Sequence, residues 1–172
     1  MTVILSVPPA GAAPALLLRP WRSDDLAALL AAHRDPLLRR WLATSLTDEA
    51  DAGRWLDAQA DGWAAATRFS FAVIADDAPA GHVVVKVGPD GTSEVGYWTA
   101  AHARGRGIAV SAVNAVSQWA FDVHAVTRLD LLHAAGNDSS CRVAVKCGYV
   151  LDLLLPAERH RHVRTATRPF QK

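Results

Sequence analysis

A glycine-rich turn between two expected elements is the part of this sequence that most plainly could do chemistry. It reads Arg104-Gly105-Arg106-Gly107-Ile108-Ala109 and lies where a strand-like run, Glu94–Trp98, gives way to a helical run, Ile108–Val123. Glycines let successive backbone N–H groups curl toward one anion, and the start of the following helix adds partial positive charge. With its two arginines, the turn is typical of a phosphate site, although an ordinary tight turn remains an alternative.

Two common phosphate loops do not account for this turn. The P-loop pattern G-x-x-x-x-G-K-[ST] is absent, and the dinucleotide fingerprint would require a small residue at Val110 in a βαβ unit that opens the domain. A second block downstream is therefore important. It runs from Asn137 to Tyr149 and reads as a helix with an N-cap residue at its start and Gly148 at its end.

Together the two blocks resemble the GNAT superfamily of N-acetyltransferases. The acetyl-CoA loop of that family reads [QR]-x-x-G-x-[GA], and its three fixed positions are filled by Arg104, Gly107 and Ala109. The family's N-x-x-[AS]…K-x-G-[FY] pattern is matched by Asn137, Ser140, Lys146, Gly148 and Tyr149. The segments Leu16–Asp25 and Glu94–Trp98 are similar to the RimJ/RimL-type branch, which acetylates ribosomal-protein N-termini. The resemblance runs from about Leu16 to about Arg168.

The resemblance implies that acetyl-CoA is the cosubstrate, and it implies which residues contact it. Arg104 and the backbone amides of Gly105, Arg106, Gly107, Ile108 and Ala109 would hold the pyrophosphate. The pantetheine arm would pair with the strand backbone at Tyr97, Trp98 and Thr99, and Asn137 would bond the same arm. For the side chains of Tyr97 and Trp98, core packing is an equal alternative.

Three residues are candidates for the proton chemistry: Glu94, Ser140 and Glu158. Many relatives have a catalytic tyrosine at the position of Ala144; Ser140, one helical turn earlier, could protonate the thiolate instead, with helix capping as its alternative role. Glu94 lies on the strand that carries the acetyl group. Glu158 lies where the N-terminal-acetyltransferase branch places its glutamate. These two compete as general base, and a surface carboxylate is the alternative for either.

Histidines offer a weaker base and a possible ligand pair. His133 ends an expected strand and has a suitable intrinsic pKa for a base. His160 and His162 share one face of a strand, but no carboxylate or cysteine completes a ligand set at the usual spacing. We therefore expect no metal site.

The elements that must position these residues follow from hydrophobic periodicity and turn residues. Helices are expected near residues 23–33, 37–42, 48–66, 108–123 and 137–147, and strands near 16–19, 69–75, 81–86, 94–98, 129–133, 149–155 and 160–166. This order predicts an α+β domain with a mixed, mostly antiparallel twisted sheet flanked by helices. The resemblance adds that two strands splay apart at the acetyl-CoA site. Residues 1–15 are expected to form a flexible segment ahead of a single domain over 16–170.

Composition limits the classes of function. The chain has 172 residues, 51% of them hydrophobic, and a formal net charge of +1, which lacks the electrostatic footprint of a nucleic-acid binder. Cys141 and Cys147 lie six apart on an expected helix and should not pair, which favours a reducing cytoplasm. We expect no membrane span and no signal peptide. Trp41, Trp55 and Trp63 are expected to pack in the core, with an apolar substrate wall as the alternative.

The function that the resemblance implies is acetyl transfer from acetyl-CoA to a primary amine, by direct attack in a ternary complex. The branch favours a protein or peptide N-terminal α-amine. A small-molecule amine, such as an aminoglycoside or a polyamine, is one alternative. A non-catalytic acyl-CoA-binding module is another, because Ala144 removes an expected hydroxyl. A homodimer is the default arrangement for the branch.

Overall fold

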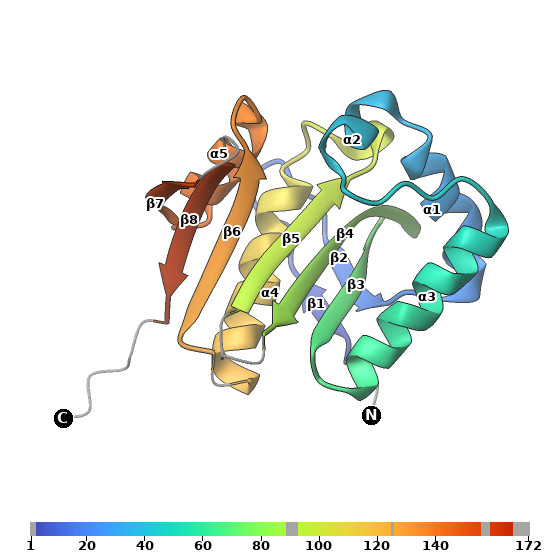
Figure 1. The fold of residues 1–172 in the computed structure, drawn as a ribbon, viewed down its shortest axis with the longest axis horizontal. Helices are drawn as coiled ribbons and strands as arrows, with labels where there is room; N and C mark the ends of the chain where they lie inside the picture. The colour runs from blue at the N-terminus through green and yellow to red at the C-terminus, as the bar shows by residue number, and fades with distance from the viewer. Residues whose placement is uncertain (1–2, 89–92, 125, 156–158, 167–172) are drawn as a thin grey trace.

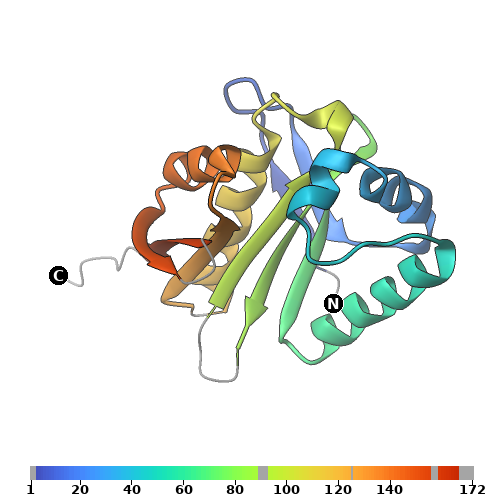
Figure 2. The ribbon, with the colours of Figure 1, turned by 45° about the horizontal axis from the view of Figure 1, so that its top comes forward.

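The chain folds around one eight-stranded sheet with helices on both faces (Figures 1 and 2). The computed structural model describes residues 3–88, 93–124, 126–155 and 159–166. The strand order is β1-β2-β3-β4-β5-β6-β8-β7, and every neighbouring pair is antiparallel except β5 and β6. The predicted α+β class with a mixed, mostly antiparallel sheet is confirmed.

The elements follow the predicted order with small shifts at their ends. The strands are β1 (Leu5–Val7), β2 (Leu16–Pro20), β3 (Arg68–Ala75), β4 (Ala78–Val87), β5 (Ser93–Thr99), β6 (Arg128–Ala134), β7 (Val150–Leu155) and β8 (Arg159–Thr165). The helices are α1 (Leu26–His33), α2 (Pro36–Trp41), α3 (Glu49–Ala64), α4 (Ile108–Val123) and α5 (Asp138–Lys146), with short 3-10 turns at Ser23–Asp25 and Ala101–Ala103.

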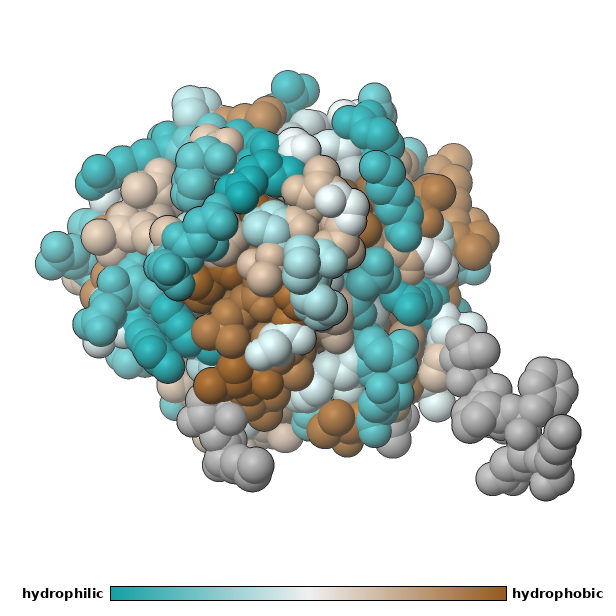
Figure 3. Space-filling model, turned by 180° about the vertical axis from the view of Figure 1, so that it is seen from behind, coloured by the Kyte–Doolittle hydropathy of each residue, from teal (hydrophilic) through white to brown (hydrophobic). Residues whose placement is uncertain are grey.

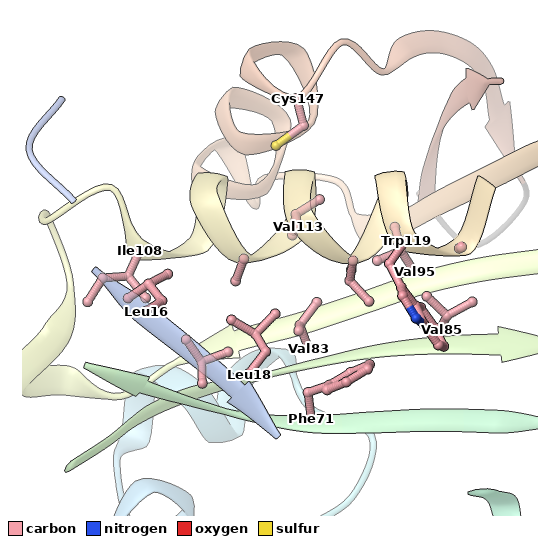
Figure 4. Close-up of a cluster of buried hydrophobic side chains, with 14 of the residues drawn as sticks. Leu16, Leu18, Phe71, Val83, Val85, Val95, Ile108, Val113, Trp119 and Cys147 are labelled. Atoms are coloured by element: carbon pink, nitrogen blue, oxygen red, sulfur yellow. The ribbon is translucent and has the colours of Figure 1, made fainter. Parts of the chain in front are cut away.

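The sheet separates two hydrophobic cores because alternate residues of each strand point to opposite faces. Phe71 and Val73 of β3 pack toward α4, in the larger core drawn in Figure 4. Between them, Ala72 joins a second core under α1 and α3, which also holds Trp98. A central sheet buried on both faces gives the site a rigid support.

Strands β5 and β6 part after a short stretch of pairing, as the resemblance implied. They pair in parallel only at Glu94 with Asp130 and at Val95 with Leu131. The rest of each strand, toward Thr99 and Ala134, has no partner in the other. Backbone N–H and C=O groups of β5 are thus left free on this side.

Two local expectations differ from the structure. Leu5–Val7, expected to be flexible, forms edge strand β1 against β2, because its aliphatic side chains pack on the larger core. The hairpin after β3 is shorter than expected. Asp76 and Asp77 both adopt positive φ, 50° and 62°, so a two-residue turn suffices and β4 begins at Ala78.

The other edge strand, β7, is apolar but exposed. Val150, Leu151, Leu153 and Leu154 are each 46–71% exposed. Seen from behind in Figure 3, hydrophobic residues reach the margin on the side of the C-terminal strands. Within the described ranges, no helix combines the length and the apolar character that a membrane crossing demands.

Candidate active site

A cavity of about 500 Å³ opens where β5 and β6 part. Its walls come from the free ends of these two strands, from the turn before α4, and from helices α2 and α5. The lining includes nine of the ten predicted cofactor contacts: Tyr97, Trp98, Thr99, Arg104, Gly105, Gly107, Ile108, Ala109 and Asn137. The fold therefore brings the two blocks singled out in the sequence to one hollow.

The glycine-rich turn presents an open helix N-terminus to this cavity. Gly105 and Gly107 adopt left-handed conformations, with φ of 77° and 74°. Gly107 is the N-cap of α4 and supplies no side chain to cap it. The first N–H groups of a helix have no intrahelical acceptor, so those of Ile108 and Ala109 are free to bind an anion.

The two arginines of the turn form ion pairs with different partners. Arg104 lines the cavity and forms an ion pair with Asp35, the N-cap residue of α2. That pair ties α2 to the turn, and it lowers the pKa of Asp35 through the hydrogen bond from Arg104. Arg106 instead forms an ion pair with Asp76 at 2.7 Å, away from the residues that line the cavity.

The charge of the cavity wall is positive. Arg142 and Lys146 of α5 lie in the lining with Arg104, whereas the lining residues in the described part of the chain include no aspartate or glutamate. Such a wall suits a ligand with several negative charges. The sequence reasoning did not single out Arg142, although a helix on which basic residues lie four apart puts them on one face.

Two hydroxyl groups meet inside the cavity. The hydroxyl of Tyr97 donates a hydrogen bond to Oγ of Ser140 at 3.1 Å. Burial raises the pKa of Tyr97 to about 12, so its phenol keeps its proton at neutral pH. The side chain of Tyr97 thus does more than pack, a role that the sequence reasoning left undecided.

Helix α5 holds Ser140 in place through its cap. Asn137 is the N-cap residue, and its side-chain oxygen accepts from the backbone N–H of Ser140 at 3.3 Å. At the other end, Gly148 has a φ of 73°, and Tyr149 donates its N–H to the carbonyl of Ala144 at 2.9 Å. Ala144, which has no hydroxyl, is fully buried in the core. The hydroxyl of α5 that contacts Tyr97 is therefore that of Ser140.

Of the two carboxylate candidates, the structure describes only Glu94, which is not among the residues that line the cavity. Glu94 lies on β5 but pairs with Lys86 of β4, with 2.6 Å between Oε1 and Nζ. Glu158 lies outside the described residues. Among the described residues, therefore, no carboxylate lines the cavity.

The histidines are placed in an unexpected way. His133 lines the cavity, but its Nε2 lies 3.2 Å from Nε2 of His162. Cys141 completes a cluster with these two and His160. The spacing along the sequence offered no cysteine to join His160 and His162, but the fold brings Cys141, 19 residues before His160, beside them.

The three tryptophans divide between core and cavity. Trp55 packs edge-on against Trp21, and Trp63 packs edge-on against Phe69 and Phe71. Trp41, at the end of α2, instead lines the cavity with its ring under the guanidinium of Arg40. One of the three thus contributes to an apolar wall.

Comparison with known proteins agrees with this geometry. A family model described as an acetyltransferase (GNAT) domain matches residues 15–150. No curated protein sequence gives a significant match. Many solved structures share the fold.

Three of these structures are informative. RimJ of Mycobacterium smegmatis, in complex with a CoA disulfide, superposes with a TM-score of 0.77 at 20% identity, over 96% of this chain and 87% of that one. RimL, a ribosomal-protein α-N-acetyltransferase solved as a CoA disulfide, gives 0.80 at 16%, over 94% and 98%. The microcin self-immunity acetyltransferase MccE, with acetyl-CoA and AMP, gives 0.79 at 17%, over 94% and 99%.

Proposed function

The chain belongs to the GNAT acetyltransferase family, and from this premise we propose that the amine it acetylates is the α-amino group of a protein or peptide N-terminus. As a member of that family it is an N-acetyltransferase with acetyl-CoA as its cosubstrate. The proposal concerns the second substrate and the residues that act on both. Its single strongest support is the absence of any carboxylate from the described lining of the cavity.

The absence of carboxylates from the described lining favours one substrate class over the others. An aminoglycoside or a polyamine carries several positive charges and needs several carboxylates opposite them. The described lining offers none. A peptide N-terminus needs only one amine in its neutral form, and the apolar surface of Leu37, Trp41 and its neighbours on α2 suits the first side chains of a peptide.

We propose the predicted contacts for acetyl-CoA. Arg104 and the free amides at the start of α4 bind the pyrophosphate, and Arg142 and Lys146 are well placed for further phosphate charge. The unpaired edge of β5 at Tyr97, Trp98 and Thr99 pairs with the pantetheine arm, and Asn137 bonds it from the other side. Arg106, which pairs with Asp76, contributes only its backbone.

The reaction forms a bond between the amine nitrogen and the acetyl carbon and breaks the carbon–sulfur bond. The amine gives up a proton, and the leaving thiolate takes one. We propose that the Ser140 hydroxyl donates to the thiolate, since Tyr97 already donates to its oxygen and so directs the serine proton outward. The serine oxygen then takes a proton from solvent, and the base gives one to solvent. The base that receives the amine proton stays a prediction: Glu158 or Glu94, the latter held by Lys86.

Assembly and location complete the proposal. A homodimer remains the prediction for this branch, and the exposed aliphatic side chains of edge strand β7 are the surface that supports it. A cytoplasmic location is supported by two cysteines that are both free.

A panel of amines tests the substrate. The purified protein is mixed with acetyl-CoA and, in turn, with short peptides, the same peptides with blocked N-termini, aminoglycosides and polyamines, and released thiol is followed. We expect thiol release with free N-termini alone, and mass spectrometry should locate the acetyl group on the α-amine and not on lysine side chains. Faster turnover of an aminoglycoside or polyamine would replace the proposal. CoA binding without turnover of any amine would support the non-catalytic alternative.

A further inference from the structure

Four side chains from three elements converge beside the active-site cavity. His133 lies near the end of β6, Cys141 in the second turn of α5, and His160 and His162 on β8. Strand register explains the convergence: His133 pairs with His160 across β6 and β8, and His162 shares its face because it lies two residues further. Helix α5 then brings the thiol of Cys141 over this face.

Their potential ligand atoms form a compact group, all within 4.8 Å of one another. The Nε2 atoms of His133 and His162 are 3.2 Å apart. The sulfur of Cys141 lies 3.3 Å from His133 Nε2, 3.5 Å from His160 Nδ1 and 3.6 Å from His162 Nε2. One nitrogen from each ring and the sulfur therefore face a common centre.

These spacings are those of a tetrahedral zinc site. Zinc binds nitrogen at about 2.0–2.1 Å and thiolate sulfur at about 2.3 Å, so a regular tetrahedron has edges of about 3.3 Å between nitrogens and about 3.6 Å between nitrogen and sulfur. The separation of 3.2 Å between the His133 and His162 nitrogens and those of 3.3–3.6 Å to the sulfur match these edges, and the His160 nitrogen lies within 4.8 Å of the other two. Four of the six edges are thus already those of a bound zinc ion.

Surrounding contacts orient one ligand in the way that metal sites require. Nδ1 of His133 lies 2.8 Å from the carbonyl oxygen of Ala134, to which it can only donate. That bond fixes the tautomer and leaves the lone pair of Nε2 directed at the cluster. His133 and His162 are only 8% and 2% exposed, so bulk water does not solvate their inward-facing nitrogens.

We propose that His133, Cys141, His160 and His162 form a four-coordinate site for Zn²⁺. Three imidazoles and a thiolate suit zinc, whereas magnesium and calcium require oxygen ligands. Four protein ligands leave no open position, so the ion is structural and performs no step of the reaction. It ties α5 to β6 and β8, and so braces the helix turn on which Ser140 precedes Cys141.

Metal binding by the unaltered protein is the first test. Full-length protein is dialysed against micromolar free zinc and its metal content is measured; we expect one zinc per chain. Cobalt alone, added to the metal-free protein, should give the visible bands of a tetrahedral site together with a near-ultraviolet thiolate charge-transfer band. Protein that retains no zinc, or cobalt that binds without the thiolate band, overturns the proposal.

Matched cysteine variants then locate the site. Cys141→Ala should weaken zinc binding by at least about tenfold and abolish the thiolate band. Cys147→Ala removes the other cysteine of the same segment, whose sulfur contacts the carbonyl of Val110 and no histidine, and should leave both unchanged. His160→Ala and the exposed His102→Ala make a second matched pair. Equal zinc affinity in Cys141→Ala and Cys147→Ala contradicts the assignment.

Thermal stability supplies a readout that needs no activity. Because zinc binds only the folded arrangement of the four ligands, the melting temperature of the wild-type protein should rise with free zinc and fall with a chelator. The melting temperature of Cys141→Ala should respond to neither. If neither zinc nor chelator changed the melting temperature of the wild-type protein, the proposal of a structural ion would be contradicted.

Discussion

At the scale of single residues, the contact between Tyr97 and Ser140 is the feature most directly tied to catalysis. The tyrosine is half-buried and protonated, and within the described residues its hydroxyl donates only to the serine oxygen. The serine oxygen therefore has one lone pair engaged and its own proton free. Such a hydroxyl is a suitable donor to a leaving thiolate.

The first prediction follows from this pair. Ser140→Ala should lower kcat by roughly 10²-fold, because it removes the proton donor, while the Kd for CoA changes little. Tyr97→Phe should lower kcat less, since it removes only the group that orients the serine. The double variant should be no slower than Ser140→Ala alone. Steady-state thiol release measures all three, and a Ser140→Ala enzyme with unchanged kcat would show that the reaction proceeds by positioning alone.

At the scale of elements, the turn before α4 determines cofactor binding through its backbone. Gly107 has a φ of 74°, and a Cβ there would lie 3.5 Å from Ala13, so the objection to a side chain is conformational strain and not a clash. A β-branched residue avoids this conformation. Replacing Gly107 with such a residue should shift the turn and redirect the free amides of α4.

Gly107→Val is therefore expected to abolish CoA binding while the chain still folds. Strain of this kind costs about 1–3 kcal/mol in the free energy of unfolding, which urea denaturation can measure. Gly148→Val is the matched control, because Gly148 has a nearly equal φ of 73° and open space around its Cβ position, but ends α5. We expect similar destabilisation and retained CoA affinity in the control, measured by calorimetry. Comparable CoA affinity in the two variants would argue against the turn as the phosphate site.

Local sequence patterns predicted most elements and nine of the residues that line the cavity. Runs of β-forming residues between turns marked β3 to β6, glycines marked the turn before α4, and Asn137 and Gly148 marked the two ends of α5. These signals lie within a few residues of one another, so they can be read without tertiary structure. Strand β1 was missed because short edge strands carry little pattern.

The histidine and cysteine cluster could not be predicted in the same way. His133 and His160 meet only because β6 and β8 pair in one particular register, and a shift of one residue would turn His160 and His162 to the other face. Cys141 joins them through helix packing, which linear ligand spacing does not reveal. The meeting of Tyr97 and Ser140, 43 residues apart, has the same origin.

At the scale of the whole molecule, the sheet separates the larger core from a second core, in which tryptophan rings surround a buried histidine. In the second core, Trp21 donates from Nε1 to Nδ1 of His82 at 3.0 Å, and the rings of Trp55 and Trp98 pack around this histidine. Burial lowers the pKa of His82 from 6.5 to about 3. His82 is therefore neutral in the folded protein throughout the physiological range.

This burial makes folding stability depend on pH. In the unfolded chain His82 takes up a proton near pH 6.5, whereas in the folded chain it stays neutral down to about pH 3. The unfolded state then binds more protons, so the stability that is fully present above pH 6.5 is lost as the pH falls toward about 3. One such group contributes a slope of up to about 1.4 kcal/mol per pH unit. Burial also lowers the pKa of His33, which adds to the slope in the same direction.

The last prediction separates His82 from the other acid-sensitive groups. His82→Asn keeps an acceptor near the position of Nδ1 for Trp21 but cannot take up a proton, so the free energy of unfolding should fall less steeply with decreasing pH than in the wild-type protein. His102→Gln, at an exposed position in the 3-10 turn Ala101–Ala103, should leave the slope unchanged. Urea unfolding at several values between neutral pH and about pH 4 gives the slopes, and comparing slopes cancels any constant cost of the substitution. If the free energy of unfolding fell with the same slope in the wild-type protein and in His82→Asn, the acid sensitivity of this fold would not arise from His82.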